Sequence, residues 1–285
     1  MKKILKWGGM ILLAIIVVLL LSGTALFVKG GRAAGQQYMV NTGEVVAATD
    51  SLAVVHGQRL TTIYGCTDCH GQDLSGRVMI DAPPFRVVAS NLTPGLGGIG
   101  RNFSTLDFDR AIRNGVRPGG TSLLIMPSKA YHKMADSEAA AIIGYLHSLP
   151  PIDNELPATE LKPLGRVLAG SGGFDVSSEV SEQAPPNGLA PAVSDQLEFG
   201  EYQSKMLCAY CHQNDFKGGV PMGPGPVPSD INPYGKLPVE QFVETMQTGV
   251  TPAGKELDGE AMPTKVFKLW TEEELAAVHA FLASL

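Results

Sequence analysis

The sequence predicts an all-α protein in which two copies of one small domain follow an N-terminal apolar helix. Three observations predict this fold: an uncharged apolar stretch near the N-terminus, four sequence blocks that occur twice in the same order, and apolar residues at helical spacing at the end of each copy. The chain has 285 residues, which is about two domains' worth. With 44% hydrophobic and 18% charged residues it is a globular protein and not a disordered chain.

The N-terminal stretch is long enough to cross a membrane. Three lysines precede an uncharged run from Trp7 to Val28, and about 20 apolar residues suffice for a spanning helix. A cleaved signal peptide is the alternative, because residues 23–25 form a small-residue cleavage site. The apolar run continues past that site and favours a retained anchor. The lysines then make residues 1–40 a cytoplasmic tip, a transmembrane anchor and a juxtamembrane segment, with the rest of the chain outside.

The chain repeats itself over most of its remaining length. Four pairs of blocks match: 66–76 with 208–218, 90–94 with 229–233, 115–118 with 249–252, and 126–149 with 262–285. The blocks keep their order and similar spacing, which indicates two copies of one domain. We therefore expect domains over 41–152 and 195–285. The segment 153–194 between them is rich in Pro, Gly, Ser and Glu and is expected to be a linker that drapes over a domain surface.

Each expected domain is helical at both ends. Asp50 and Asp195 are suitable N-caps for helices that end near Tyr64 and Leu207. The Thr-x-x-Glu sequence at 271–274 has the spacing of a capping box before the last helix. Little in either copy alternates in the manner of a half-buried strand, so the sequence predicts no sheet.

The motif Cys-x-x-Cys-His occurs once in each copy and uses every cysteine of the chain. This pattern is typical of covalent haem c attachment, and its residues are Cys66, Cys69, His70, Cys208, Cys211 and His212. Two thiols three residues apart on a helical turn can both reach the vinyl groups of one haem, and the histidine then lies under the iron. A zinc site is the alternative, but the two cysteine pairs lie far apart in separate copies. A thioredoxin-like dithiol would need a strand–helix setting, which is missing. We therefore predict two covalently attached haem c groups.

Methionine is the expected sixth iron ligand in both copies. Met126 and Met262 are equivalent, and each precedes a proline that would stiffen the loop; a thioether ligand raises the reduction potential of haem. The alternative is that both are core methionines. Other methionines are less suitable: Met134 aligns with Trp270, and Met79 and Met222 lie in loops. The remaining histidines have no histidine counterpart in the other copy, although His132 leaves a bis-histidine first haem open.

Haem propionates need hydrogen-bond donors. The candidates are Asn91, Arg113, Arg117, Lys129 and Tyr131 in the first copy, and Asn232 and Lys265 in the second.

With these motifs, the chain resembles the membrane-anchored dihaem cytochromes c of bacteria, including cytochrome subunits of periplasmic dehydrogenases or oxidases. The resemblance covers both copies and implies two tandem class I cytochrome c domains, each a small all-α globule around one haem. It implies an electron-transfer protein, or a subunit of an oxidoreductase complex, rather than an enzyme by itself.

The implied function is single-electron relay on the periplasmic side of the inner membrane. The donor would be a dehydrogenase or a quinol-oxidising complex, and the acceptor an oxidase, a soluble cytochrome or a reaction centre. Redox proteins are the expected partners, with no small-molecule substrate. The net charge of −6 argues against nucleic acid, and the second copy alone carries −7, which suits a basic redox partner. A dihaem peroxidase or a haem-based sensor is the alternative, and each would need an open iron site.

Overall fold

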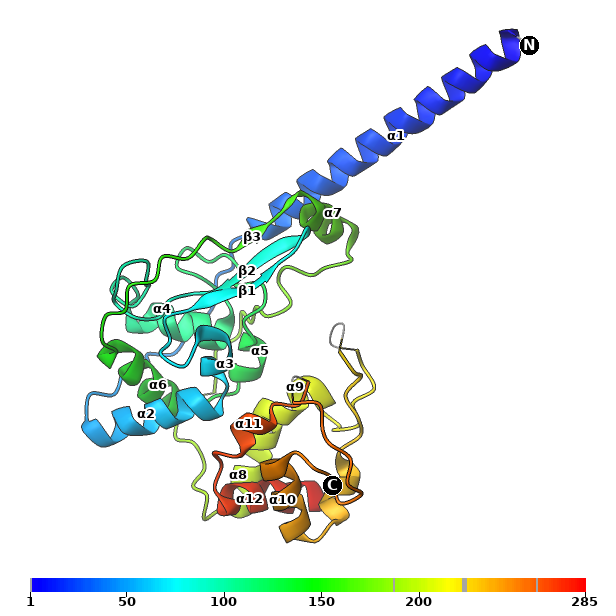
Figure 1. Cartoon of the computed structure of the whole chain (residues 1–285). Coiled ribbons are helices and arrows are strands. Elements are labelled where there is room, and N and C mark those ends of the chain that lie inside the picture. The colour runs from blue at the N-terminus through cyan, green and yellow to red at the C-terminus, as the bar shows by residue number, and fades with distance from the viewer. Residues whose placement is uncertain (1, 187, 222–224, 260) are drawn as a thin grey trace.

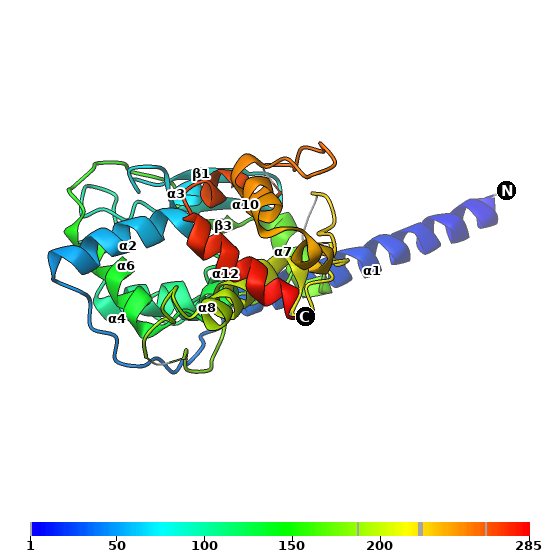
Figure 2. The same ribbon diagram turned by 90° about the horizontal axis from the view of Figure 1, so that it is seen from below.

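The computed structural model describes residues 2–186, 188–221, 225–259 and 261–285. Its first element is the long helix α1 (Lys2–Ala34), which projects from the rest of the chain (Figures 1 and 2). The large apolar side chains between Trp7 and Leu21 are exposed. By length and composition α1 is able to cross a membrane, in agreement with the apolar helix that the sequence predicts.

The first copy is framed by two helices that bracket the haem motif and the methionine loop. In order, its elements are α2 (Ser51–Ile63), α3 (Cys66–His70), β1 (Arg77–Asp81), β2 (Phe85–Ala89), α4 (Thr105–Asp109), the π-helical turn η1 (Arg110–Asn114), α5 (Ser128–Tyr131) and α6 (Asp136–Ser148). Asp50 caps α2 as predicted, because its carboxylate accepts the Ala53 N–H at 2.8 Å.

The second copy repeats the two terminal helices, the short helix of the haem motif and the short helix after the methionine, and it lacks the hairpin. Its elements are α8 (Gln196–Gln203), the π-helical turn η2 (Ser204–Cys208), α9 (Ala209–His212), the 3₁₀ helix η3 (Asn232–Lys236), α10 (Val239–Thr248), α11 (Thr264–Phe267) and α12 (Glu272–Ala283). The predicted capping box is confirmed: Thr271 Oγ1 accepts the Glu274 N–H, and the Glu274 carboxylate accepts the Thr271 N–H.

The first and last helices of each copy cross at a glycine. In the first copy α2 packs on α6, and a Cβ atom on Gly57 would overlap the Ala141 carbonyl oxygen. In the second copy α8 packs on α12, and a Cβ atom on Gly200 would overlap the carbonyl oxygen of Ala277. Ala141 and Ala277 are equivalent in the repeated blocks, so the same backbone-to-backbone approach is made twice.

A small antiparallel sheet in the first copy departs from the all-helical prediction. Strand β1 pairs with β2, and β2 pairs with the short β3 (Glu160–Leu161). An irregularity between Val78 and Ile80 shifts the register. The prediction of no sheet is wrong here because all five residues of β1 are exposed, so the strand lacks the apolar–polar alternation that marks a half-buried strand.

The segment 153–194 runs over the first copy and contributes secondary structure to it. Besides β3 it contains α7 (Pro163–Ser171), which packs against α1. Further along, the Asn114 side chain donates to the Ser181 carbonyl at 2.8 Å and to the Gln183 carbonyl at 3.0 Å. Strand β3 and these hydrogen bonds tie the segment to the first copy on either side of α7.

The two copies contact each other through equivalent residues. Arg59 of α2 forms an ion pair with Glu274 at 2.6 Å, and the Tyr202 hydroxyl of α8 donates to Glu138 at 2.5 Å. Arg59 and Tyr202 each follow the crossing glycine by two residues, and Glu138 and Glu274 match in the repeated blocks. Likewise α5 contacts η2 and α9 while α11 contacts α2. The contact is therefore reciprocal, like the two-fold interface of a symmetric dimer.

Candidate functional site

Both Cys-x-x-Cys-His motifs adopt a helical turn at the end of a longer helix. Gly65, with a φ of 76°, separates α2 from α3, in which Cys66, Cys69 and His70 lie. In the second copy the chain continues from η2 directly into α9, so that Cys208 ends one helical turn and Cys211 lies in the next. In each copy the two thiols are one helical turn apart and the histidine follows at once, which is the arrangement that the sequence predicts.

A main-chain carbonyl orients the histidine of each motif. His70 Nδ1 lies 2.8 Å from the Ser90 carbonyl oxygen, and His212 Nδ1 lies 2.7 Å from that of Ser229. Because a carbonyl only accepts, Nδ1 carries the proton in both rings, and Nε2 keeps the lone pair that binds a metal. Burial lowers the pKa of His70, which favours the neutral ring.

An unusual backbone conformation holds the accepting carbonyl in place. Leu74 and Phe216 have φ values of 58° and 59°, which few non-glycine residues adopt, and both side chains are buried. Their carbonyls accept the N–H groups of Leu92 and Ile231, each at 2.9 Å. Leu92 and Ile231 each come two residues after the serine, Ser90 or Ser229, whose carbonyl orients the histidine. The loop that sets the histidine ring is thus built in the same way in both copies.

The four cysteines are free thiols. Burial raises the pKa of both Cys66 and Cys208 to about 12, so these thiols are protonated at neutral pH. Cys69 and Cys211 also have raised pKa values, again because of burial. Among the described residues no group of three or more His, Cys, Asp or Glu side chains is placed to hold a metal ion, so the zinc alternative gains no support.

The two candidate methionines occupy equivalent loops. The Met126 carbonyl accepts the Ser128 N–H, and the Met262 carbonyl accepts the Thr264 N–H, both at 2.7 Å. Both side chains are partly buried and pack against the apolar cluster that includes Leu74, Leu92 and Phe216. Met134 and Trp270 are buried in the core, as expected for packing residues, and Met222 lies outside the described residues. The two methionines thus border the apolar cluster that contains Leu74 and Phe216, each four residues after the histidine of its motif.

His132 is engaged at both ring nitrogens. Its Nδ1 lies 2.9 Å from the Arg113 carbonyl oxygen, and its Nε2 lies 3.2 Å from the Ser181 hydroxyl. Neither nitrogen is left to bind iron, so the structure disfavours the bis-histidine alternative.

Most of the expected propionate donors have other partners. The fully buried Arg113 guanidinium forms ion pairs with Asp109 at 2.5 Å and with Asp136 at 2.8 Å. The other engaged donors bond mainly to main-chain carbonyls; these are Asn91 (to Ile152), Arg117 (to Ser122), Tyr131 (to Tyr64) and Asn232 (to Asp215 and to the Asp230 side chain). Lys129 and Lys265 are exposed.

A buried polar network between the copies was not predicted. The Tyr64 hydroxyl donates to Glu138 at 2.7 Å and accepts a hydrogen bond from Gln203 at 3.0 Å, and Tyr202 donates to the other Glu138 oxygen. Burial raises the pKa of Glu138, while the two phenol hydrogen bonds act in the opposite direction. Tyr64 lies two residues before Cys66. The only hint in the sequence was that Glu138 and Glu274 are equivalent in the repeated blocks. This equivalence does not show that either residue contacts the other copy.

The donor set of each copy fits haem c. Each has two thiols on one helical turn, a histidine with Nε2 available, a thioether in an equivalent loop and a shared apolar cluster. In addition, the buried Trp270 indole N–H has no hydrogen-bond acceptor among the described residues, and a carboxylate of the bound group would satisfy it.

The chain is similar to cytochrome subunits of several dehydrogenases. It is 27% identical over 170 residues to the fructose dehydrogenase cytochrome subunit of Gluconobacter japonicus, which is 56% of this chain and 34% of that protein. It is 31% identical over 179 residues to the cytochrome c subunit of alcohol dehydrogenase (quinone) of Gluconacetobacter polyoxogenes, covering 57% of this chain and 36% of that subunit. With the gluconate 2-dehydrogenase cytochrome c subunit of Pantoea cypripedii it shares 31% identity over 122 residues, which are 39% of this chain and 27% of that subunit.

No family model matches the chain. The matched part is about a third of the length of the first two relatives. Homologues of this chain are therefore cytochrome c subunits of dehydrogenases, at modest identity over about half of its length.

Proposed function

We propose that the chain is a dihaem c-type cytochrome that relays single electrons at the outer face of a membrane. The observation that carries the proposal is the duplicated histidine geometry, with Nδ1 bonded to a main-chain carbonyl in both motifs. Electron transfer is also the role expected of a homologue of cytochrome c subunits. A haem iron that changes between the ferric and ferrous states is the chemistry which the bound group supplies.

Cysteine residues would attach the group without any outside oxidant. Each thiol would add across one vinyl group: the S–H bond and the π bond of the vinyl C=C would break, and one S–C and one C–H bond would form. Cys66 and Cys69 would carry one haem, and Cys208 and Cys211 the other. Burial raises the pKa of the Cys66 and Cys208 thiols, so in the folded chain both would enter this addition in the S–H form.

The iron ligands would be His70 with Met126 and His212 with Met262. The carbonyls of Ser90 and Ser229 fix the ring planes of the histidines and increase the basicity of Nε2. The apolar cluster next to the methionines would keep water away from the bound group, and a closed ligand shell would limit reorganisation during electron transfer. Such a shell suits an electron carrier and leaves no position for a substrate.

In this proposal α1 anchors the chain, and both copies lie on the outer face of the membrane. The length of α1 and the lysines at its start support this placement. Electrons would come from a dehydrogenase or a quinol-oxidising complex and go to an oxidase, a soluble cytochrome or a reaction centre. The dehydrogenase names of the homologues support the first of these donors.

The test is a visible spectrum of the purified full-length protein together with a haem count per chain. We expect two haems per chain, both low-spin, with the far-red band of methionine-ligated ferric iron and no response of the ferrous form to carbon monoxide. One haem per chain would contradict the dihaem assignment. A high-spin fraction that binds carbon monoxide would contradict the closed shell and favour a peroxidase or a sensor.

A further inference from the structure

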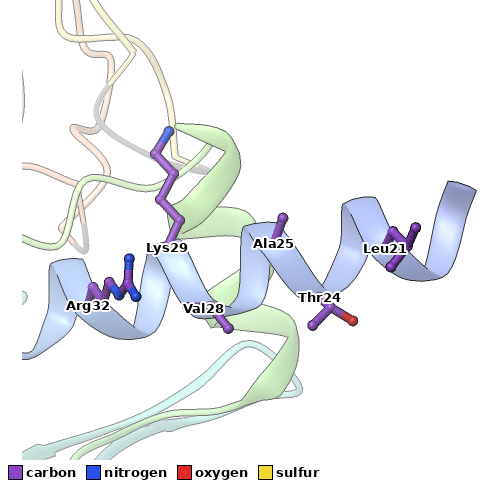
Figure 3. A pocket seen from close by; sticks show the side chains of 6 residues that line it. All are labelled: Leu21, Thr24, Ala25, Val28, Lys29 and Arg32. Atoms are coloured by element: carbon purple, nitrogen blue, oxygen red, sulfur yellow. The ribbon is translucent and has the colours of Figure 1, made fainter.

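Helix α7 lies directly along the last turns of α1. A Cβ atom on Gly30 would overlap the Arg166 carbonyl oxygen, and one on Gly170 would overlap the carbonyl oxygen of Leu26. Gly30 meets Arg166 and Leu26 meets Gly170, so the backbones of the two helices are in contact where α7 crosses α1 (Figure 3). The Arg166 guanidinium also lies 5.2 Å from the ring centre of Phe27, a favourable cation–π distance. Helix α7 is thus attached to α1 and cannot tilt independently.

This contact falls where α1 would leave the hydrocarbon of a membrane. About 20 helical residues cross the apolar core of a bilayer, and 20 residues counted from Trp7 end at Leu26. The closest backbone approaches to α7 are at Leu26 and Gly30. Helix α7 is therefore held at the level of the bilayer surface.

The outward face of α7 is apolar and is not covered by any described part of the chain. One side of the helix meets α1, and another meets the hairpin, where Gly165 lies against the Pro84 carbonyl. The remaining side carries Leu164 and Leu168, four residues apart, which are 48% and 37% exposed. The helix contains no acidic residue. An apolar face on a helix without acidic residues is what the boundary between lipid head groups and acyl chains accommodates.

Helix α1 has a shallow hollow on its exposed side, over the same turns that contact α7 with their other side. Its lining residues are Leu21, Thr24, Ala25, Val28, Lys29 and Arg32 (Figure 3). The apolar residues come first along the helix, and the two cations follow at its outer end. Lys29 and Arg32 have no carboxylate partner within the described part of the chain. A phospholipid fits this order, with an acyl chain against the apolar residues and the phosphate near the cations.

We propose that α7 is an interfacial helix that seats the first copy on the phospholipid surface beside α1. The inference rests on the proposed membrane anchoring and extends it: the chain would meet the bilayer at two places, the spanning helix and the apolar face of α7. A single spanning helix lets the attached domains swivel, whereas two contacts fix how the haem sites face the membrane. The occupant of the exposed face is thus lipid and not a protein partner.

Photo-crosslinking in vesicles of phosphatidylglycerol and phosphatidylethanolamine tests this proposal on the full-length, haem-loaded chain. Benzoylphenylalanine replaces Leu168 in one variant, Trp7 in a second and Leu197 in a third. Leu197 is the matched control, because it is a 54% exposed leucine on α8 in the second copy, away from α1 (Figure 1). After illumination, mass spectrometry measures the fraction of each variant that carries a lipid adduct. All three side chains are exposed, and the haem spectrum verifies the fold of each variant.

We expect lipid adducts at positions 7 and 168, with at least a tenfold lower yield at position 197. Adducts at position 7 without adducts at position 168 would overturn the proposal for α7 and leave the anchor intact. If no lipid adduct formed at position 7 or at position 168, the proposed membrane anchor would be overturned as well. Crosslinks from position 168 to a second copy of the chain would show a protein occupant and overturn the proposal. Equal yields at 168 and 197 would also overturn it, because they would reflect lipid collisions at any exposed site.

Discussion

The histidine rings in both haem motifs are positioned by the main chain and not by another side chain. The acceptors are the carbonyls of Ser90 and Ser229, and the positive-φ residues Leu74 and Phe216 fix the loops that carry them. A substitution of the serine side chain leaves the accepting carbonyl in place. The orientation of the ring therefore depends on the fold of the loop, and it persists unless the loop itself is displaced.

Replacing Met126 by Ala tests the proposed sixth ligand at the level of one residue. We expect half of the haem to become high-spin and to bind carbon monoxide, because only one of two irons loses its thioether. The reduction potential of that haem should fall, since a thioether ligand raises it. Carbon monoxide difference spectra and a redox titration measure both effects.

The control for this experiment is Met79→Leu, because Met79 is an exposed methionine in β1. Its spectrum should equal that of the unmodified protein. If Met126→Ala also leaves the spectrum unchanged, Met126 is a core residue and not a ligand.

The crossing of the terminal helices in each copy depends on the absence of a side chain. A Gly200→Ala substitution places a methyl group on the Ala277 carbonyl oxygen and pushes α8 away from α12. We expect the free energy of unfolding to fall by about 1–3 kcal/mol, as in other overpacked contacts, in a denaturant titration. Gly225→Ala is the control, because a Cβ atom there meets nothing within 4 Å, and it should change stability little. Equal stability of both variants would mean that the helices separate without cost.

The contact between the copies should depend on pH through Glu138. Burial raises the pKa of Glu138 above its ordinary value, so the folded chain keeps a proton that the unfolded chain has already released. Stability should therefore fall as pH rises from the ordinary glutamate value through the raised folded value. A Tyr202→Phe substitution removes one hydrogen bond to the carboxylate and leaves the Ala135 N–H without its acceptor. We expect a loss of about 1–3 kcal/mol at neutral pH.

The Tyr202→Phe penalty should shrink at acid pH, where Glu138 is protonated and its hydrogen bonds are weaker. Denaturant unfolding over a pH series measures it. Tyr145→Phe serves as the control, because no hydrogen bond of the Tyr145 hydroxyl is found in the described structure. A penalty that is equal at acid and neutral pH would contradict the role of the ionised carboxylate.

The helices at the ends of each copy could be predicted from sequence because their signals are local. Asp50 and the 271–274 capping box act within one helical turn, and both form as expected. The β1–β2 hairpin was missed because β1 lies exposed along its whole length. The ion pairs of Arg113 were missed for a different reason: Asp109 is one helical turn away, but Asp136 comes from another element. The sequence shows that Arg113 is charged, but it does not show which carboxylate from another element will lie next to it in the fold.

Across the whole molecule, charge separates the two copies. Residues 41–152 are neutral, whereas 195–285 carry −7. If the second copy docks on a basic redox partner, the rate of electron transfer should fall several-fold between about 10 mM and about 150 mM salt, as the Debye length shrinks from about 30 to about 8 Å. Stopped-flow mixing with a basic soluble cytochrome c measures this rate.

The surface variant Glu240→Gln/Glu244→Gln should weaken the salt dependence, because both residues are exposed on α10. The matched control removes the same charge elsewhere, with Glu44→Gln/Glu182→Gln, and should leave the salt dependence closer to that of the unmodified chain. Rates that do not change with salt would mean that the acidic residues only keep the second copy soluble.

The reciprocal contact between the copies also bears on how the chain can change over evolutionary time. In a homodimer the same gene encodes both halves of the interface, so every substitution is present in both subunits. Here the equivalent positions carry Arg59 on one side and Tyr202 on the other, facing Glu274 and Glu138. One half has an ion pair and the other a buried phenol–carboxylate bond. Each half can therefore change alone, and in the proposed dihaem cytochrome the two sites would be free to acquire different reduction potentials, which would set the direction of electron flow along the chain.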